Sequence, residues 1–362
     1  MRTEIATREH EPALRELTMQ SMPTWIRLAY PHSPDFFRAE ALKGFRVDSF
    51  VVLDTDGRVG GCGTRSLKRV WLDGSPATVG YLGNMRSFPH ARKKSGLFRA
   101  YEFFKRFSES DDVPFYFSSI LRDNRAAIAI LTSRRARLPR YEPCGDICSF
   151  ATHANALGIP SMPTASRFTI ERGDETDLAA LTAFYNEQRA RRQLFPVFNA
   201  TLFSTPEFAS LRLSDFIVIR RDREIVAATA LWDQQAMRQI RVEAYAPLLA
   251  AARPFLNPVS RLLRYPTLPP PGSCIAHNYL AFLSVRDDSP EIFSILLTAA
   301  AARLGKAILL FALHERDPLF PVARQLRAWR YWSTLYCVTW QENPFALKML
   351  QQGIPYFELA GV

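Results

Sequence analysis

The order of hydrophobic and polar residues predicts that two stretches of the chain begin in the same way. Residues 3–7 alternate as in a short strand, and residues 9–19 then place apolar side chains at helical spacing. Residues 167–172 again have the pattern of a strand, and Asp174 is positioned to cap a helix that runs through Asn186. The repeated strand–helix order indicates a duplicated architecture whose two copies have diverged in sequence.

After each opening, the pattern continues as an antiparallel meander followed by alternating helices and strands. In the first half the expected strands are 49–53, 58–69, 77–86, 114–121 and 147–152, and the expected helices are 100–108 and 124–137. In the second half the expected strands are 216–220, 224–232, 238–245, 276–285, 307–313 and 332–339, and the expected helices are 290–304 and 318–329. Residues 247–271 form a proline-rich excursion. The chain is therefore assigned to the α/β (α+β) class.

A segment rich in Gly, Pro and Ser separates the two stretches. It begins at Asn155 and runs through Thr164, and this composition is typical of a connection between domains. A chain of 362 residues has the length of about two domains. We therefore expect one domain at residues 1–155, a linker at 156–165 and a second domain at 166–362.

The charge of the chain favours an anionic small molecule over nucleic acid as a partner. The formal net charge is +11, and both halves carry a basic excess without a basic tail. A diffuse positive field of this kind suits a phosphate-bearing metabolite at least as well as a polyanion. Nucleic acid is therefore not an expected partner.

Composition also excludes several kinds of site. The five cysteines are too scattered for a disulfide framework, and the six histidines form no metal-ligand spacing, so no metal is expected. The longest apolar stretch, residues 292–302, is too short to span a bilayer, and the first residues lack the apolar core of a signal peptide. These features predict a cytoplasmic protein without a membrane partner.

The segment from Ser87 to Arg99 has the order strand, basic loop, glycine, helix. Unpaired backbone N–H groups and the dipole at the start of a helix favour a phosphate there, and Gly96 permits close approach of the backbone. Arg92, Lys93, Lys94 and Arg99 add positive charge around the same point. The residues alone are equally compatible with an exposed basic turn before a surface helix.

The order of elements around this loop resembles the GNAT superfamily of acyl-CoA-dependent N-acyltransferases. The pyrophosphate motif of that family is Arg/Gln-x-x-Gly-x-Gly/Ala, and here Lys93 and Phe98 depart from it while Gly96 fits. Gly96 to Ala100 is more similar to the variant loop of multi-domain members such as the Eis type. A second landmark, an Asn that opens the next helix, is present as Asn124. The resemblance covers residues 1–155.

The resemblance implies two tandem domains, each with a mixed, mostly antiparallel sheet flanked by helices. It implies that acetyl-CoA or another acyl-CoA binds where the fourth strand separates from the fifth, and that an amine attacks its thioester. The residues implied in cofactor binding are Ser87, Phe88, Arg92, Lys93, Lys94, Ser95, Gly96, Leu97, Phe98, Arg99 and Asn124. The expected partners are therefore an acyl-CoA and an amine-bearing acceptor.

The catalytic groups of the family are only partly present. Leu131 stands where many members have a tyrosine that protonates the leaving thiolate, and the fourth strand carries no acid. Asn84, Tyr81 and Tyr141 are the candidates for catalytic positions that remain. The alternatives are that Asp48 or Glu142 supplies the base, or that a neutral amine is taken from solution.

The second half has no loop equivalent to the one at Gly96. Asp287 and Asp288 lie at the corresponding position of the second half and would repel a diphosphate. We therefore expect a degenerate second domain that binds no cofactor. The function expected first is acyl-CoA-dependent N-acyltransferase; the alternatives are a CoA-binding sensor or interaction protein, and a transferase that uses aminoacyl-tRNA.

Overall fold

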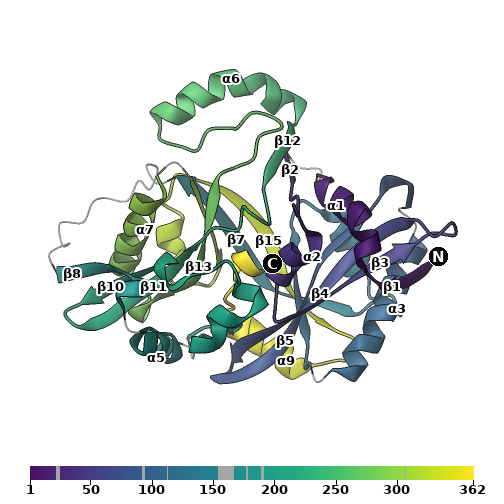
Figure 1. Ribbon diagram of the computed structural model, residues 1–362, viewed down its shortest axis with the longest axis horizontal. Coiled ribbons are helices and arrows are strands. Elements are labelled where there is room, and N and C mark those ends of the chain that lie inside the picture. The colour runs from purple at the N-terminus through teal and green to yellow at the C-terminus, as the bar shows by residue number, and fades with distance from the viewer. Residues whose placement is uncertain are drawn as a thin grey trace.

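One large sheet runs through the whole molecule. The computed structural model describes residues 1–21, 25–91, 94–111, 113–153, 167–176, 178–188, 191–305 and 307–362. Within these residues, the 13 strands of the sheet follow the order β1-β3-β4-β5-β6-β15-β7-β14-β13-β11-β10-β8, with β9 (Phe195–Pro196) attached to β4. Figure 1 shows helices on both sides of this sheet and a projecting arm above it. The expected mixed, mostly antiparallel sheet flanked by helices is confirmed.

The first-half strands form the predicted meander and then change direction. They are β1 (Arg2–Ile5), β3 (Arg46–Leu53), β4 (Val59–Leu72), β5 (Ser75–Ser87) and β6 (Tyr116–Leu121). Neighbours are antiparallel from β1 to β5, whereas β5 and β6 are parallel. The helix between them therefore forms a crossover connection, which returns the chain from the end of β5 to the start of β6, as parallel pairing requires.

Alternate residues of β3 pack against helices on opposite faces of the sheet. Val51 packs with α1 (Glu11–Met19) and α2 (Phe36–Ala41), while Phe50 packs with α3 (Lys94–Ser110) and α4 (Arg125–Leu131). The side-chain alternation of a strand produces this division. Helix α4 is shorter than the predicted helix 124–137, because the chain turns at Arg134, which has φ +51°.

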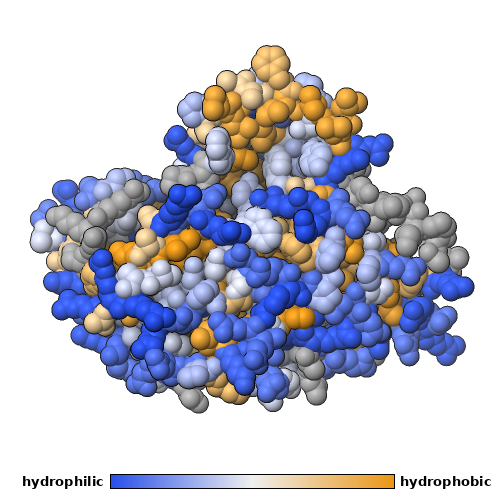
Figure 2. Space-filling model, turned by 180° about the vertical axis from the view of Figure 1, so that it is seen from behind, coloured by the Kyte–Doolittle hydropathy of each residue, from blue (hydrophilic) through white to orange (hydrophobic). Residues whose placement is uncertain are grey.

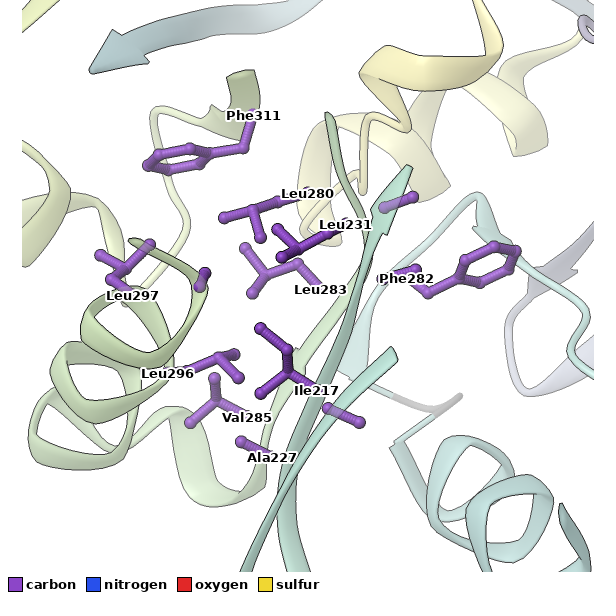
Figure 3. Close-up of a cluster of buried hydrophobic side chains, with 14 of the residues drawn as sticks. Ile217, Ala227, Leu231, Leu280, Phe282, Leu283, Val285, Leu296, Leu297 and Phe311 are labelled. Carbon is purple, nitrogen blue, oxygen red and sulfur yellow. The ribbon is translucent and has the colours of Figure 1, made fainter. Parts of the chain in front are cut away.

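The second half repeats this order with β8 (Phe168–Arg172), β10 (Phe216–Arg221), β11 (Glu224–Trp232), β13 (His277–Val285) and β14 (Ile308–His314). Its main helices are α5 (Leu178–Gln188) and α7 (Pro290–Leu304). Figure 3 shows Leu296 and Leu297 of α7 facing the sheet residues Ile217, Leu280 and Val285. This cluster is the largest core of the molecule, and burial of such side chains contributes about 1.5–3 kcal/mol each.

The two halves exchange their long strands. Strand β15 (Ala328–Thr339), from the end of the chain, lies between β6 and β7 (Arg140–His153), and β7 lies between β15 and β14. Residues 333–338 of β15 pair antiparallel with Leu121–Tyr116 of β6. Each half therefore completes its sheet with a strand of the other.

One expected element of the second half is wrong, and another forms but lies outside the main sheet. The helix expected at 318–329 is reduced to α8 (Phe320–Ala323), because the chain from Ala328 onward is drawn into the centre of the sheet, where both edges of β15 are paired. The strand expected at 238–245 is β12 (Arg241–Tyr245), which leaves the sheet and pairs with β2 (Ile26–Ala29) instead. Helix α9 (Pro344–Gln352) follows β15 and had no sequence signal.

Strands β2 and β12 support an arm that projects from the sheet (Figure 1). The segment expected as a proline-rich excursion contains a helix, α6 (Pro247–Leu262), with Pro254 and Pro258 inside it. Asn257 holds the returning chain, because its side chain bonds both the N–H and the carbonyl of Leu268. Among the described residues, no helix is long and apolar enough to cross a membrane.

Candidate active site

Strands β5 and β6 are joined at one end and separate at the other. Their parallel pairing covers only Gly80 with Tyr116 and Tyr81 with Phe117. Beyond this, the Ser118 hydroxyl donates 2.8 Å to the Leu82 carbonyl. The remaining residues of β5 run to Ser87 with their edge toward β6 free of strand pairing. The sheet thus has an opening in its middle.

Asn84 lies at a bulge beside this opening. Its φ is +52°, a left-handed conformation that asparagine tolerates better than most residues. The register between β4 and β5 shifts at the same place, as expected where a bulge inserts an extra residue. The bulge re-aims the backbone and the Asn84 side chain relative to the rest of β5.

A groove of about 380 Å³ leads to the opening between α3 and α4. Its lining residues come from the start of the chain, from β3, β4 and β5, from the turn after β5, and from the first two turns of α3 and from α4. They are Met1, Phe50, Val52, Gly60, Gly61, Cys62, Met85, Arg86, Ser87, Ala91, Gly96, Leu97, Ala100, Ala126, Ala127 and Ile130. The walls are mainly apolar, with backbone groups at the end of β5 and at the start of α3. An elongated ligand with an anionic group matches this combination.

Three of the residues predicted for cofactor binding line this groove. Ser87, Gly96 and Leu97 are part of the lining. A Cβ at Gly96 would lie 3.5 Å from Val52, an ordinary contact, so the packing of the protein does not itself demand glycine there. Phe88 is buried with α1 and α2, and Phe98 packs beside the core under α3. These two aromatic residues therefore support the groove rather than form its wall.

The basic residues of the predicted loop are only partly described. Arg92 and Lys93 lie outside the described residues, as do the side chains of Lys94 and Ser95. The Arg99 guanidinium donates to the Met1 carbonyl and so ties α3 to the start of the chain. The described part of the loop shows that α3 begins at Lys94, with its amino end at the groove.

Asn124 caps α4 beside the groove. Its side-chain oxygen accepts a hydrogen bond of 3.2 Å from the N–H of Ala127, a residue of the groove lining. Caps of this type satisfy a backbone donor that has no partner within the helix. The structure therefore gives Asn124 a definite local role and places it next to the groove.

Tyr141 and Tyr81 are buried on opposite faces of the sheet. The Tyr141 hydroxyl lies 2.6 Å from that of Tyr101, and burial raises its pKa well above the usual value. The Tyr81 hydroxyl lies 3.3 Å from Ser119 Oγ, and burial raises its pKa as well. Both phenols therefore stay protonated at ordinary pH and have partners within the protein.

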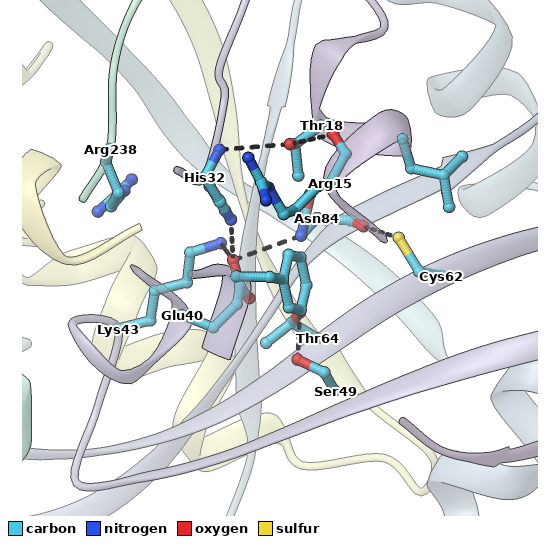
Figure 4. Close-up of polar contacts among 12 residues, drawn as sticks. Arg15, Thr18, His32, Glu40, Lys43, Ser49, Cys62, Thr64, Asn84 and Arg238 are labelled. Carbon is cyan, nitrogen blue, oxygen red and sulfur yellow. Dashed lines mark hydrogen bonds and ion pairs between the residues drawn. The ribbon is translucent and has the colours of Figure 1, made fainter. Parts of the chain in front are cut away.

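Asn84 contacts a buried polar cluster of His32, Glu40 and Lys43 (Figure 4). Glu40 Oε1 lies 2.7 Å from Lys43 Nζ, 3.1 Å from His32 Nδ1 and 3.4 Å from Asn84 Nδ2. The Arg86 guanidinium donates 2.9 Å to Asn84 Oδ1 from the other side. Glu40 Oε2 has no hydrogen-bond partner among the described residues. Two charged groups from α2 and its flanks are thus brought to the bulge.

Arg238 from the second half lies next to this cluster. Its backbone forms an isolated bridge with that of His32, and its side chain is bonded to the Ala360 carbonyl. Among the described residues around Glu40, Lys43 and Arg86 supply cations at the bulge, and the charge of Arg238 also acts on His32. The local charge is positive.

The pKa values follow from burial and from these charges. Burial opposes ionisation of Glu40, but the charge of Lys43 and the contact with His32 outweigh it and lower the pKa of Glu40 far below its usual value. The pKa of His32 is lowered to about 4: burial is the main cause, Glu40 opposes it, and the charges of Lys43 and Arg238 add to it. Burial lowers the pKa of Lys43, and the charge of Glu40 opposes this effect. At neutral pH the cluster therefore holds a carboxylate and a neutral imidazole.

This assignment predicts an acid-sensitive stability. Because the pKa of His32 is about 4 in the folded protein and 6.5 as a model value, folding disfavours the charged ring. The contribution of His32 to the free energy of unfolding is fully present above pH 6.5. About 3 kcal/mol of it is lost as the pH falls toward 4. We expect urea titrations to show a smaller loss of unfolding free energy over this range in His32→Gln. Parallel pH profiles would contradict the assignment.

Local sequence pattern gave no sign of this cluster. His32 and Glu40 lie in a part of the chain that had no predicted element, and only Asp35 was available as a helix signal, since it caps α2 through the Arg38 N–H. Arg238 joins from the other half. Such an assembly depends on the tertiary fold.

The two acids named as alternative bases are engaged elsewhere. Asp48 lies 3.0 Å from Arg65, a fully buried guanidinium, and Glu142 lies 3.0 Å from Arg134. Neither carboxylate is among the groove-lining residues. No group of His, Cys, Asp and Glu suited to a metal ion is found among the described residues.

The second half has an equivalent opening, but the chain itself fills it. Strands β13 and β14 pair only over residues 277–279, and Phe282 beyond them has φ +53°. The N–H of Phe282 donates 2.8 Å to Glu358, and that of Leu283 donates 2.9 Å to the Tyr356 hydroxyl. Burial raises the pKa of Glu358 to about 6. The backbone donors at this bulge are therefore already used.

The loop after β13 is also neutralised from within. Arg192 lies 2.7 Å from Asp288 and 3.0 Å from Asp317, and Arg191 lies 2.9 Å from Asp287. The first half instead presents the glycine of the groove at the corresponding place. The openings of the two halves are thus chemically different.

Comparison with known proteins supports the fold at low sequence identity. No protein-family model and no curated protein sequence matches the chain. A GCN5-related N-acetyltransferase from Anabaena variabilis matches with TM-score 0.53 and 11% identity, over 94% of this chain and 73% of that one. The glucosamine N-acetyltransferase region of a fungal multi-domain β-N-acetylglucosaminidase gives 0.60 and 13%, over 92% and 38% of the two chains.

A third solved structure also matches nearly the whole of this chain. The N-myristoyltransferase of Saccharomyces cerevisiae with bound myristoyl-CoA matches with TM-score 0.55 and 9% identity, over 95% of this chain and 80% of that one. In each case the likeness covers both halves of the chain. The protein therefore has the fold of the GCN5-related N-acyltransferases, a mixed α/β fold on a mostly antiparallel sheet.

Proposed function

We propose that the protein is an acyl-CoA-dependent N-acyltransferase whose active site is the opening between β5 and β6. The observation that carries this proposal is the groove between α3 and α4, which leads directly to the bulge at Asn84. The groove presents a free strand edge and a helix amino end in line. These suit the amide-bearing arm and the diphosphate of an acyl-CoA.

The division of labour between the halves is part of the proposal. Residues 1–155 would hold the cofactor, residues 156–165 would connect, and residues 166–362 would complete the acceptor side without binding a second cofactor. The internal bonds of Phe282 and Leu283 to Glu358 and Tyr356 support this, since an acyl-CoA would have to displace them. Arg238 is the contribution of the second half to the polar cluster.

The chemistry follows from the charges around the bulge. Attack of an amine forms a C–N bond, breaks the C–S bond and releases a proton and a thiolate. The surplus of Lys43, Arg86 and Arg238 near the bulge disfavours an ammonium ion, so a neutral amine is the species that enters. The same cations stabilise negative charge on the thioester oxygen and on the leaving sulfur. Positioning of the two reactants supplies most of the remaining acceleration.

Asn84 and Tyr81 are proposed to orient the reactants rather than to transfer protons. Asn84 is fixed from both sides by Glu40 and Arg86, so its amide has a defined direction beside the opening. Tyr81 of β5 forms the last pair with β6, opposite Phe117. Tyr141 stays in the proposal as a hydrogen-bonding group below the opening, where it is bonded to Tyr101. Acetyl transfer to a primary amine is the simplest reaction of this site.

Substitution of Gly96 tests the cofactor site. Gly96→Glu places a carboxylate at the start of α3, and we expect it to weaken acetyl-CoA binding at least about tenfold, a difference of roughly 1.4 kcal/mol. Gly96→Ala is the matched control, because its Cβ meets only Val52 at an ordinary distance. Calorimetry on both variants is the measurement, and the unmodified protein should saturate at one cofactor per chain. Equal affinity of the two variants would move the cofactor away from this loop.

A non-catalytic protein that binds CoA is the second candidate. The observation in its favour is Leu131, which is buried in the core under α4 where many GNAT members carry a tyrosine. Release of free thiol from acetyl-CoA in the presence of a panel of primary amines separates the candidates. Amine-dependent thiol release supports the transferase; binding without release supports the sensor.

A further inference from the structure

Helix α6 turns its apolar side chains toward solvent. Leu248 and Phe255 are each 78% exposed and Leu262 is 82% exposed, and Val259 between them is also exposed. These residues follow the spacing of a single helix face. Figure 2 shows the resulting hydrophobic surface at the tip of the arm, which stands clear of the rest of the molecule.

Two polar side chains of α6, Arg253 and Asn257, face the returning chain. The Arg253 guanidinium donates 3.1 Å to the Leu268 carbonyl, and Asn257 bonds the same residue through both of its amide groups. These bonds fix the rotation of the helix against the returning chain. The helix cannot hide its apolar face by turning over, so a hydrophobic stripe remains in water unless something covers it.

The arm is also purely cationic. Between Ala244 and Val285 the chain has no Asp or Glu, whereas it carries Arg253, Arg261 and Arg264. Arg261 and Arg264 are exposed at the end of the helix, next to Leu262. Apolar side chains and arginines are therefore presented together on one convex ridge, with exposed Trp25 at its base, where the Ala246 N–H donates to the Trp25 carbonyl.

We propose that α6 is a docking element for the surface of an anionic lipid bilayer. A helix of 16 residues is about 24 Å long and can lie in the interfacial plane with its apolar stripe below the headgroups. Arginines at its flank then meet anionic headgroups, and an indole at the base suits the same depth. Lying on a bilayer needs no membrane-spanning segment, so the absence of an apolar stretch long enough to cross does not bear on it.

Charge decides between a bilayer and a second copy of the chain. A symmetric pairing of two arms would place the arginines of both copies in one interface in which neither arm offers a carboxylate. A convex ridge also offers no groove into which a partner helix could fit. An anionic surface satisfies both the charge and the shape.

Vesicle flotation with the full chain tests the proposal. We expect binding to vesicles of phosphatidylglycerol and phosphatidylcholine in equal parts, and little binding to phosphatidylcholine alone. Phe255→Ser with Leu262→Ser should lower the partition coefficient at least about tenfold. Phe345→Ser is the matched control, since this side chain is 70% exposed on α9, away from the arm. Circular dichroism verifies that all variants stay folded.

Two further measurements complete the test. Arg261→Gln with Arg264→Gln should weaken binding to the anionic vesicles, and added salt should weaken the unmodified protein in the same way. Unchanged flotation of the double serine variant, or no binding to anionic vesicles at all, would overturn the proposal. Concentration-dependent dimerisation in sedimentation velocity that the serine substitutions abolish would assign the stripe to a second copy instead.

Discussion

A fragment that contains only residues 1–160 is expected not to fold. Strand β15 lies between β6 and β7, so the fragment loses the strand that both of them pair with. Two sheet edges and the side chains beneath them, including Tyr141 and Ile120, would be exposed together. Loss of this central strand affects the cooperative folding of the whole fragment rather than one contact. We therefore expect a featureless near-ultraviolet circular dichroism spectrum and aggregation.

Supplying the second half separately is the control for this experiment. Co-expression of residues 1–155 with residues 166–362 should restore a soluble complex, because the missing strand is then available to both fragments. Purification through a tag on either fragment should recover both in equal amounts. A folded, monomeric first fragment that binds acetyl-CoA would show that β15 is dispensable for the first half.

Removal of the Glu40 carboxylate is expected to destabilise the protein strongly. Glu40→Ala leaves Lys43 buried without its partner, and such losses cost about 3–5 kcal/mol. Replacement of the pair, as Glu40→Leu with Lys43→Met, removes both charges and should recover much of the unfolding free energy measured in urea. Glu16→Ala, at an exposed position of α1, should change stability by less than about 0.5 kcal/mol.

The same variants separate structure from function. Glu40 fixes the side chain of Asn84, and a shift of that amide beside the opening should lower kcat/KM on the order of a hundredfold. We expect the double variant to recover stability but not acyl transfer. Recovery of both would make the pair a purely structural element of α2.

Much of the fold follows from local pattern. The meander of β3, β4 and β5 was predicted because hairpin turns at Asp56-Gly57 and Asp73-Gly74 separate alternating segments. The exchange of β7 and β15 was not, since both are apolar strands that satisfy the same alternation wherever they pair. Pairing partners of this kind depend on topology, which a single sequence does not encode locally.

Helix α6 illustrates a second limit. The segment was expected only as a proline-rich excursion, and Pro254 and Pro258 inside the helix each lack an N–H for the helix ladder. The helix forms nonetheless, since Asn257 and Arg253 anchor it to the returning chain at Leu268. Tertiary contacts outweigh propensity here, and they also reverse the usual orientation of the apolar face.

For the candidate site, sequence pattern singled out Gly96 but not the charged groups near the groove. Gly96 was recognised because a glycine between a basic loop and a helix has a physical reason, and the structure places it in the groove lining. His32, Glu40 and Arg238 come from segments without a motif and meet only after folding. The basic residues Arg92 and Lys93 lie outside the described residues, so their role stays a prediction.

The exchanged strand also delays completion of the sheet during synthesis of the chain. When β6 leaves the ribosome at Leu121, its partner β15 is still about 220 residues from completion at Thr339. At typical elongation rates this interval is on the order of 10 to 40 s, much longer than a helix or hairpin needs to form. Throughout it, β6 and then β7 expose open edges to other nascent chains. Slow codons after β7 would lengthen this exposure, and chaperones that hold the first half would protect it.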